Sequence, residues 1–97
     1  MEILLREDFE PCLNQLFTIR SHDVGIKAQL VEVKALGNPF RDGAREPFSL
    51  LFEADAGYGL LNQGLYPMTN STLGENTIFL VPVGLKASLY QYEAVFN

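Results

Sequence analysis

The chain has 97 residues, of which 47% are hydrophobic and 20% charged, values ordinary for one globular domain spanning residues 1–97. Seven Lys and Arg against twelve Asp and Glu give a net charge of −5. A chain of this sign repels phosphate backbones and anionic lipid, so we expect neither nucleic acid nor a membrane surface as a partner.

Cysteine usage and the amino terminus indicate the compartment. Cys12 is the single cysteine, so no intrachain disulfide forms, whereas small secreted domains usually depend on disulfides. The first residues include Glu2 and only a short apolar run, unlike a secretory signal. No apolar run approaches the roughly 20 residues of a membrane span. We therefore expect a cytoplasmic protein.

The first predicted element is a short helix over Arg6–Leu13. Phe9 and Leu13 lie four residues apart and share one helix face. Pro11 limits the helix to about two turns. Asn14 is expected to end it, because Asn tolerates the left-handed backbone conformation better than most residues.

The chain then changes to a strand pattern. Leu16–Arg20 is a short strand, and Ser21–Gly25 is a turn. In Ile26–Leu36 apolar and polar residues alternate, but the phase changes between Leu30 and Val31. The change predicts a β-bulge or a strand bent over a barrel rim, and the alternative is that both faces are covered locally.

Two further strands follow a long polar connection. Pro47–Asp55 alternates most clearly. A glycine-punctuated loop separates it from Leu65–Thr69, which Pro67 places at a sheet edge because proline has no N–H to donate. Thr72–Glu75 is predicted to be a hairpin turn.

The last two strands are strongly apolar. Asn76–Gly84 is apolar on both faces, which predicts a strand between two layers, such as a sheet and a helix. Leu89–Phe96 alternates again. Apolar residues concentrate in Phe48–Ala54, Ile78–Val83 and Tyr90–Phe96, so the second half is expected to build most of the core.

The pattern as a whole is about six strands, short turns and one small helix. Because strands do not alternate with long helices, a doubly wound fold is excluded. An open sheet of this size would leave its edges exposed. We therefore predict a mainly β fold, a small closed antiparallel barrel with the N-terminal helix over one mouth or edge. A two-sheet sandwich is the alternative.

Several segments resemble a family of small bacterial proteins of about 100 residues whose function is not assigned. The matching stretches are Glu46–Phe52, Gln63–Tyr66, Leu73–Glu75, Phe79–Gly84 and Tyr92–Asn97, with looser matches at Phe9, Phe17 and Leu30–Val33. The resemblance covers nearly the whole chain. It implies an association with gene clusters that also encode tail-collar-type proteins related to phage tails, and it supplies no catalytic residue. The chain departs from the family pattern at Asn14, where glycine is usual, and over residues 67–70, where the usual stretch is more charged.

Candidate catalytic and metal-binding residues are few. His22 stands within Ser21–Asp23, but three consecutive residues in a turn cannot form a triad, which a fold assembles from separated positions. One His and one Cys leave carboxylates as the remaining ligand type, and convergence of Asp42, Glu53 and Asp55 is the alternative. We expect no catalytic residue, metal or cofactor.

The other chemically active side chains have structural explanations. Glu7, Asp8 and Glu10 lie at the start of the helix, where the helix dipole favours acids. Cys12 lies beside Pro11 and near these acids, which favour the thiol over the nucleophilic thiolate.

The connection over residues 38–46 is the best candidate for a protein interface. Phe40, Arg41, Asp42, Arg45 and Glu46 place an aromatic ring among charges of both signs. Interface centres are enriched in aromatic residues and arginine. The alternative is a solvated loop with Phe40 folded back.

The four tyrosines suggest a second kind of site. Tyr90 and Tyr92 share a strand face with Phe96 and are expected to pack in the barrel. Tyr58 and Tyr66 are the candidates for a small-ligand site at a barrel mouth.

These observations favour a non-enzymatic β-barrel interaction or assembly module, accessory to a phage-tail-like system. It would bind a protein partner or a second copy through residues 38–46 or a strand edge near Pro67. A small-ligand-binding barrel is the first alternative, and a carboxylate-based enzyme is the second.

Overall fold

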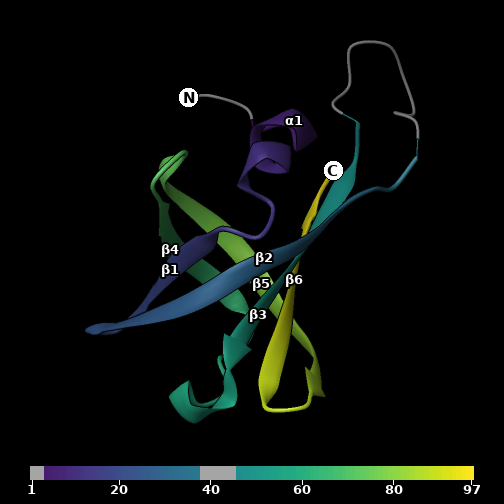
Figure 1. Cartoon of the computed structure of the whole chain (residues 1–97). Coiled ribbons are helices and arrows are strands. Elements are labelled where there is room, and N and C mark those ends of the chain that lie inside the picture. The colour runs from purple at the N-terminus through teal and green to yellow at the C-terminus, as the bar shows by residue number, and fades with distance from the viewer. Residues whose placement is uncertain (1–3, 38–45) are drawn as a thin grey trace.

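The computed structural model describes residues 4–37 and 46–97. Figure 1 shows a short helix above a twisted sheet that curls into a barrel. In chain order the elements are α1 (Arg6–Phe9), the 3₁₀ turn η1 (Glu10–Cys12), β1 (Leu16–Ser21), β2 (Val24–Ala35), β3 (Phe48–Asp55), the 3₁₀ turn η2 (Ala56–Tyr58), β4 (Gly64–Asn70), β5 (Gly74–Lys86) and β6 (Leu89–Phe96). The predicted mainly β fold with one short helix is confirmed.

The strands close into an antiparallel barrel in the order β1-β2-β3-β6-β5-β4. Two meanders, β1-β2-β3 and β4-β5-β6, make up the wall. They join between β3 and β6 along the full length of both strands. The second junction, between β1 and β4, consists of only two residue pairs, Thr18 with Thr69 and Ile19 with Met68. The structure is thus the predicted barrel and not the sandwich.

Two β-bulges bend the wall. The register between β2 and β3 shifts between Leu30 and Glu32, which leaves Val31 as the extra residue and confirms the predicted bulge. A second shift, between Pro82 and Gly84 of β5, was not predicted. Proline inside a sheet is found at edges and bulges because it cannot donate to the ladder, which explains this position.

The N-terminal helix spans α1 and η1, Arg6 to Cys12, and so ends one residue before the predicted Leu13. The Asp8 carboxylate accepts a hydrogen bond from the Leu5 N–H at 2.8 Å and so caps the first turn. Pro11 lies in η1, where the helix tightens to 3₁₀ geometry and ends at Cys12. Asn14 has φ 71°, so its predicted left-handed conformation is confirmed, and its N–H donates to the Leu30 carbonyl at 2.7 Å.

Tight turns connect the strands of each meander. Residues 22–23 join β1 to β2, and residues 87–88 join β5 to β6, with His22 and Ala87 both at φ 55°. The turn between β4 and β5 occupies residues 71–73, so it begins one residue before and ends two residues before the predicted turn at Thr72–Glu75.

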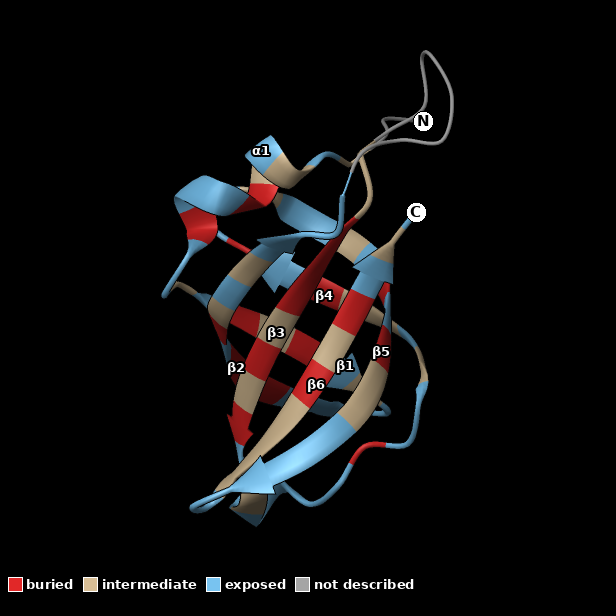
Figure 2. Cartoon of the chain, turned by 90° about the vertical axis from the view of Figure 1, so that its right-hand side faces the viewer, coloured by how far each residue is buried: buried red, intermediate tan, exposed pale blue. Residues whose placement is uncertain are grey.

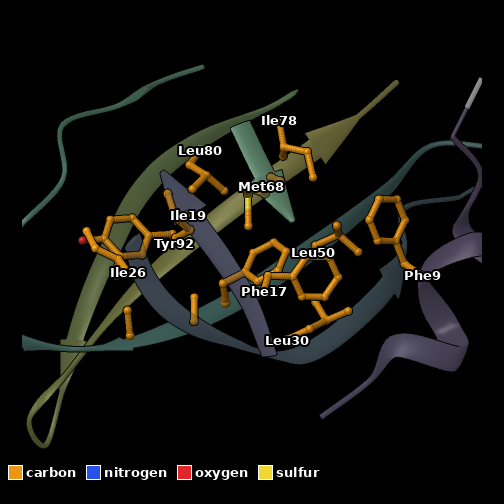
Figure 3. Close-up of a cluster of buried hydrophobic side chains, with 14 of the residues drawn as sticks. Phe9, Phe17, Ile19, Ile26, Leu30, Leu50, Met68, Ile78, Leu80 and Tyr92 are labelled. Atoms are coloured by element: carbon orange, nitrogen blue, oxygen red, sulfur yellow. The ribbon is translucent and has the colours of Figure 1, made fainter. Parts of the chain in front are cut away.

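Side chains fill the interior of the barrel. Figure 2 shows buried and less buried residues alternating along each strand, and Figure 3 shows the buried side chains pointing toward one another. Phe9 of α1 enters one end, where its ring lies 5.9 Å from that of Phe48 and 5.5 Å from that of Phe96. Phe17 contacts Phe52 edge-on at 5.1 Å deeper in the barrel.

Two expectations about the core are wrong. The first half of the chain contributes as fully as the second, with Phe9, Ile19 and Leu30 completely buried. β5 does not lie between two layers. Among the described residues no element covers its outer face, where Phe79 is 46% exposed. The reason is that α1 lies over the end of the barrel and not over its wall (Figures 1 and 2).

Over residues 4–37 and 46–97, the helices are all too short and too polar to cross a bilayer.

Candidate functional site

Most of the predicted interface connection lies outside the described residues. This holds for Phe40, Arg41, Asp42 and Arg45. The remaining member, Glu46, lies within the described residues.

Glu46 joins the start of β3 to α1. Its Oε1 lies 2.9 Å from Nε of Arg6, whose Nη1 lies 3.2 Å from Oε2 of Glu10. Arg6 Nε and Glu46 Oε1 are shielded from solvent and are not aligned for a hydrogen bond, so the contact is ionic. In the described residues Glu46 thus has a structural role, between the helix and the barrel.

The two predicted ligand-binding tyrosines have different surroundings. Tyr58 is 46% exposed and, with Asp55 and Gly57, lines a shallow depression of about 220 Å³. Tyr66 is absent from that lining, and its hydroxyl donates to the Asn62 carbonyl at 2.6 Å. The depression is smaller than the roughly 300–1,000 Å³ of typical small-molecule sites.

The carboxylates considered for a metal site are used locally. Asp55 caps η2 by accepting from the Gly57 N–H at 2.7 Å. Glu53 accepts from the Gln91 amide at 2.8 Å across β3 and β6. In the part of the chain that the structure describes, no three His, Cys, Asp or Glu side chains gather as metal ligands would. Asp42 lies outside that part.

Cys12 is completely buried beneath the β4–β5 turn. Its Sγ lies 3.6 Å from Oδ1 of Asn70 and 3.7 Å from the Asp8 carbonyl. Burial raises the pKa of the Cys12 thiol, a hydrogen bond with Thr72 partly offsets this, and the Asp8 charge raises it further. The direction of this pKa shift agrees with the expectation that Cys12 favours its thiol form.

Tyr92 is also buried, as predicted. Its hydroxyl accepts a hydrogen bond from the Leu61 N–H at 2.9 Å and so holds the loop after η2 against the barrel. Burial raises the pKa of Tyr92, and the bond from Leu61 partly offsets this.

The most distinctive surface feature is an apolar patch on the outside of the barrel. Leu65 of β4 and Phe79 of β5 are direct cross-strand partners. They are 68% and 46% exposed, although Leu and Phe are among the residues most often fully buried. Val81, two residues beyond Phe79, and Val95 of β6, 49% exposed, continue the outward-facing apolar surface. We name Leu65, Phe79, Val81 and Val95 the apolar wall.

Acidic residues border the apolar wall. Glu93 of β6 pairs directly with Val81. Glu75 lies on β5 four residues before Phe79, and therefore on the same outward alternation. Interaction surfaces of this kind combine an apolar centre with a polar rim.

Sequence reasoning missed Leu65 and Phe79 as surface residues. It assigned Phe79 to a strand covered on both faces. The signal that could have corrected this is the outward series Glu75, Thr77 and Phe79, because two polar members show that this face of β5 meets water.

Comparison with known proteins gives a family and no function. Searches of curated proteins and of solved structures return no match. The family model for the domain of unknown function DUF6916 matches residues 4–96. This range includes all six strands, α1 and the apolar wall, and the chain therefore belongs to the DUF6916 family.

Proposed function

We propose that this domain is a non-enzymatic protein-interaction module that binds through its apolar wall. The observation that carries the proposal is the exposure of the Leu65–Phe79 pair on an otherwise well-packed barrel. Contiguous exposed apolar patches rimmed by polar groups mark interaction sites in soluble proteins. Removing these two side chains from water would stabilise a complex by about 2–3 kcal/mol, given their partial exposure.

An assembly role in a phage-tail-like system is part of the same proposal. It is supported by the family resemblance noted from the sequence. We place the protein in the cytoplasm, where a single buried thiol such as Cys12 stays reduced. Gene neighbourhoods of the family would test this setting, since they should encode structural proteins of such particles.

A small-ligand site is the second candidate function. The observation that favours it is the depression lined by Asp55, Gly57 and Tyr58. Its volume of about 220 Å³ limits the site to a ligand smaller than drug-sized molecules. Thermal-shift screening of small metabolites against the wild type and Tyr58→Ala would show a shift that the variant loses.

The interaction module is tested by removing the apolar wall. The wild type is immobilised and exposed to an extract of its own cells or to added copies of this chain, and the amount of bound protein is measured. We expect the double variant Leu65→Ser/Phe79→Ser to retain at least tenfold less of the partner protein, or of the added copies, than the wild type does. Leu85→Ser is the matched control, because Leu85 is 59% exposed on the same strand but outside the apolar wall.

Both variants should unfold within a few degrees of the wild type, since substitutions at exposed positions are usually small in effect. Equal retention by the wild type, the control and the double variant would contradict the proposal.

A further inference from the structure

We infer that the apolar wall binds a second copy of this chain, on the opposite side of that copy's barrel. The inference rests on the proposed function and names its partner. It starts from the charged side chains that border the two walls. Outward-facing Arg20 of β1 and Lys27 of β2 are both exposed, and exposed Leu16 lies on the same face. We name Leu16, Thr18, Arg20 and Lys27 the basic wall.

The strand order places the β5 and β6 part of the apolar wall opposite the basic wall, whereas Leu65 lies on β4, which is next to β1. In the closed ring β1-β2-β3-β6-β5-β4, β6 stands three positions from β1, and β5 stands three positions from β2. In a six-membered ring three positions are half of the circumference. The basic wall on β1 and β2 therefore faces away from the part of the apolar wall on β5 and β6.

The basic wall offers both of the contacts that the apolar wall needs. Leu16 is 59% exposed and presents an apolar surface. Lys27 pairs with Thr18, and its Nζ donates to the Thr18 hydroxyl at 2.8 Å. This bond fixes the lysine on the face of the sheet and uses one of its three N–H donors, so two donors remain for a carboxylate.

The charges beside each wall determine which wall of one copy can bind which wall of a second copy. Two apolar walls face to face would bring Glu75 and Glu93 of both copies together. Two basic walls would bring together Arg20 and Lys27 of both copies. Like charges placed opposite each other across an interface cost several kcal/mol. Only a mixed contact, between the apolar wall of one copy and the basic wall of another, sets Glu93 and Glu75 against Arg20 and Lys27, with apolar groups between them.

A mixed contact between opposite walls leaves one wall of each kind free at the two ends. Such a heterologous contact adds further copies in a row and does not stop at a dimer. A standard interface buries about 800 Å² per partner, which is about an eighth of the 6181 Å² of accessible surface of this chain.

Charge reversal tests the pairing. Sedimentation velocity at low ionic strength should give a wild-type mass that rises with concentration past the dimer. Lys27→Glu and Glu93→Lys should each weaken association at least tenfold, because each sets like charges together. An equimolar mixture of the two variants should associate again, since each reversed wall meets its opposite. Lys86→Glu, outside the two walls at the β5–β6 turn, should associate as the wild type does.

Three results would overturn the inference, provided that the variants keep the wild-type circular dichroism spectrum. The first is that the wild type stays monomeric up to about millimolar concentration. The second is that Lys27→Glu associates as strongly as the wild type. The third is that the equimolar mixture of Lys27→Glu and Glu93→Lys fails to associate. A monomeric wild type would overturn this inference alone. Unchanged partner retention by Leu65→Ser/Phe79→Ser would instead overturn the proposed function.

Discussion

At the scale of single residues, Asn70 is the polar centre of the packing. It is 3% exposed, and its Oδ1 accepts from the N–H groups of Thr72 and Leu73 at 2.8 and 3.1 Å. Its Nδ2 donates to the Leu16 carbonyl at 3.0 Å and to Oε1 of Gln15 at 3.2 Å. One side chain therefore shapes the β4–β5 turn and fastens it to the start of β1.

We expect Asn70→Leu to lower the free energy of unfolding by about 3 kcal/mol. The substitution keeps the size of the side chain and leaves several partially buried backbone groups without partners, each at a cost of about 1–3 kcal/mol. Urea denaturation measures the change. Asn62→Leu is the control, because Asn62 is exposed and should change stability by less than about 0.5 kcal/mol. A similar loss in both variants would contradict the role of Asn70.

Residues differ in how far the sequence predicts them. Asn14 was predicted to adopt the left-handed conformation, because a helix end is a local signal. Asn70 was not singled out, because its partners Gln15 and Leu16 lie 55 and 54 positions away in the chain. No local pattern contains that pairing.

At the scale of elements, α1 is attached to the barrel mainly by one buried side chain, that of Phe9. Seven residues in α1 and η1 are too few to be stable alone. Phe9 is completely buried, and its ring meets those of Phe48 and Phe96, which themselves stack 4.7 Å apart. The helix is therefore held by its insertion into the barrel end and not by its own hydrogen bonds.

Phe9→Ala should lower the free energy of unfolding by about 3–5 kcal/mol, the range for a large-to-small change in a core. Guanidinium denaturation followed by tyrosine fluorescence would measure it. Leu13→Ala provides a comparison at the end of the same segment, because Leu13 is 43% exposed and should cost far less. A loss below 1 kcal/mol for Phe9→Ala would show that the helix does not close the barrel.

The two bulges show which sequence signals allow a β-bulge to be predicted. The Val31 bulge was predicted because alternation changes phase visibly where polar residues mark the outer face. The bulge at Val83 lies in a run of apolar residues, and no polar residue there reveals a change of phase. Pro82 and Gly84 were the available signals. The same apolar run concealed that Phe79 is exposed.

At the scale of the whole molecule, the barrel and the sandwich differ by one short seam. Two meanders joined only between β3 and β6 would leave the free edges of β1 and β4. The pairs Thr18–Thr69 and Ile19–Met68 close that gap. Because the pairing is short, long-range and without a distinctive sequence pattern, the sequence favoured a closed barrel only on the general ground of exposed edges and kept the sandwich as the alternative.

Two buried ionisable side chains, Cys12 and Tyr92, make the whole fold sensitive to alkaline pH. Burial raises the pKa of Cys12 above its ordinary 9.0 and that of Tyr92 above 10.0. Above these ordinary values the unfolded chain releases protons that the folded chain keeps. Folding stability is therefore fully present below about pH 9 and is lost as the pH rises further. Each group contributes up to about 1.4 kcal/mol for each pH unit in which only the unfolded chain is deprotonated.

We expect the free energy of unfolding, measured by urea titration from pH 8 to 11, to fall more steeply for the wild type than for Cys12→Ala/Tyr92→Phe. The double variant starts from a lower stability, because it loses the bond from Leu61 to Tyr92, so the comparison concerns the slope against pH. Tyr58→Phe is the control, because it removes a tyrosine hydroxyl at a position that is 46% exposed. Parallel curves of unfolding free energy against pH for the wild type and the double variant would contradict this prediction. They would mean that the wild type releases no more protons on unfolding than a chain that lacks both buried groups.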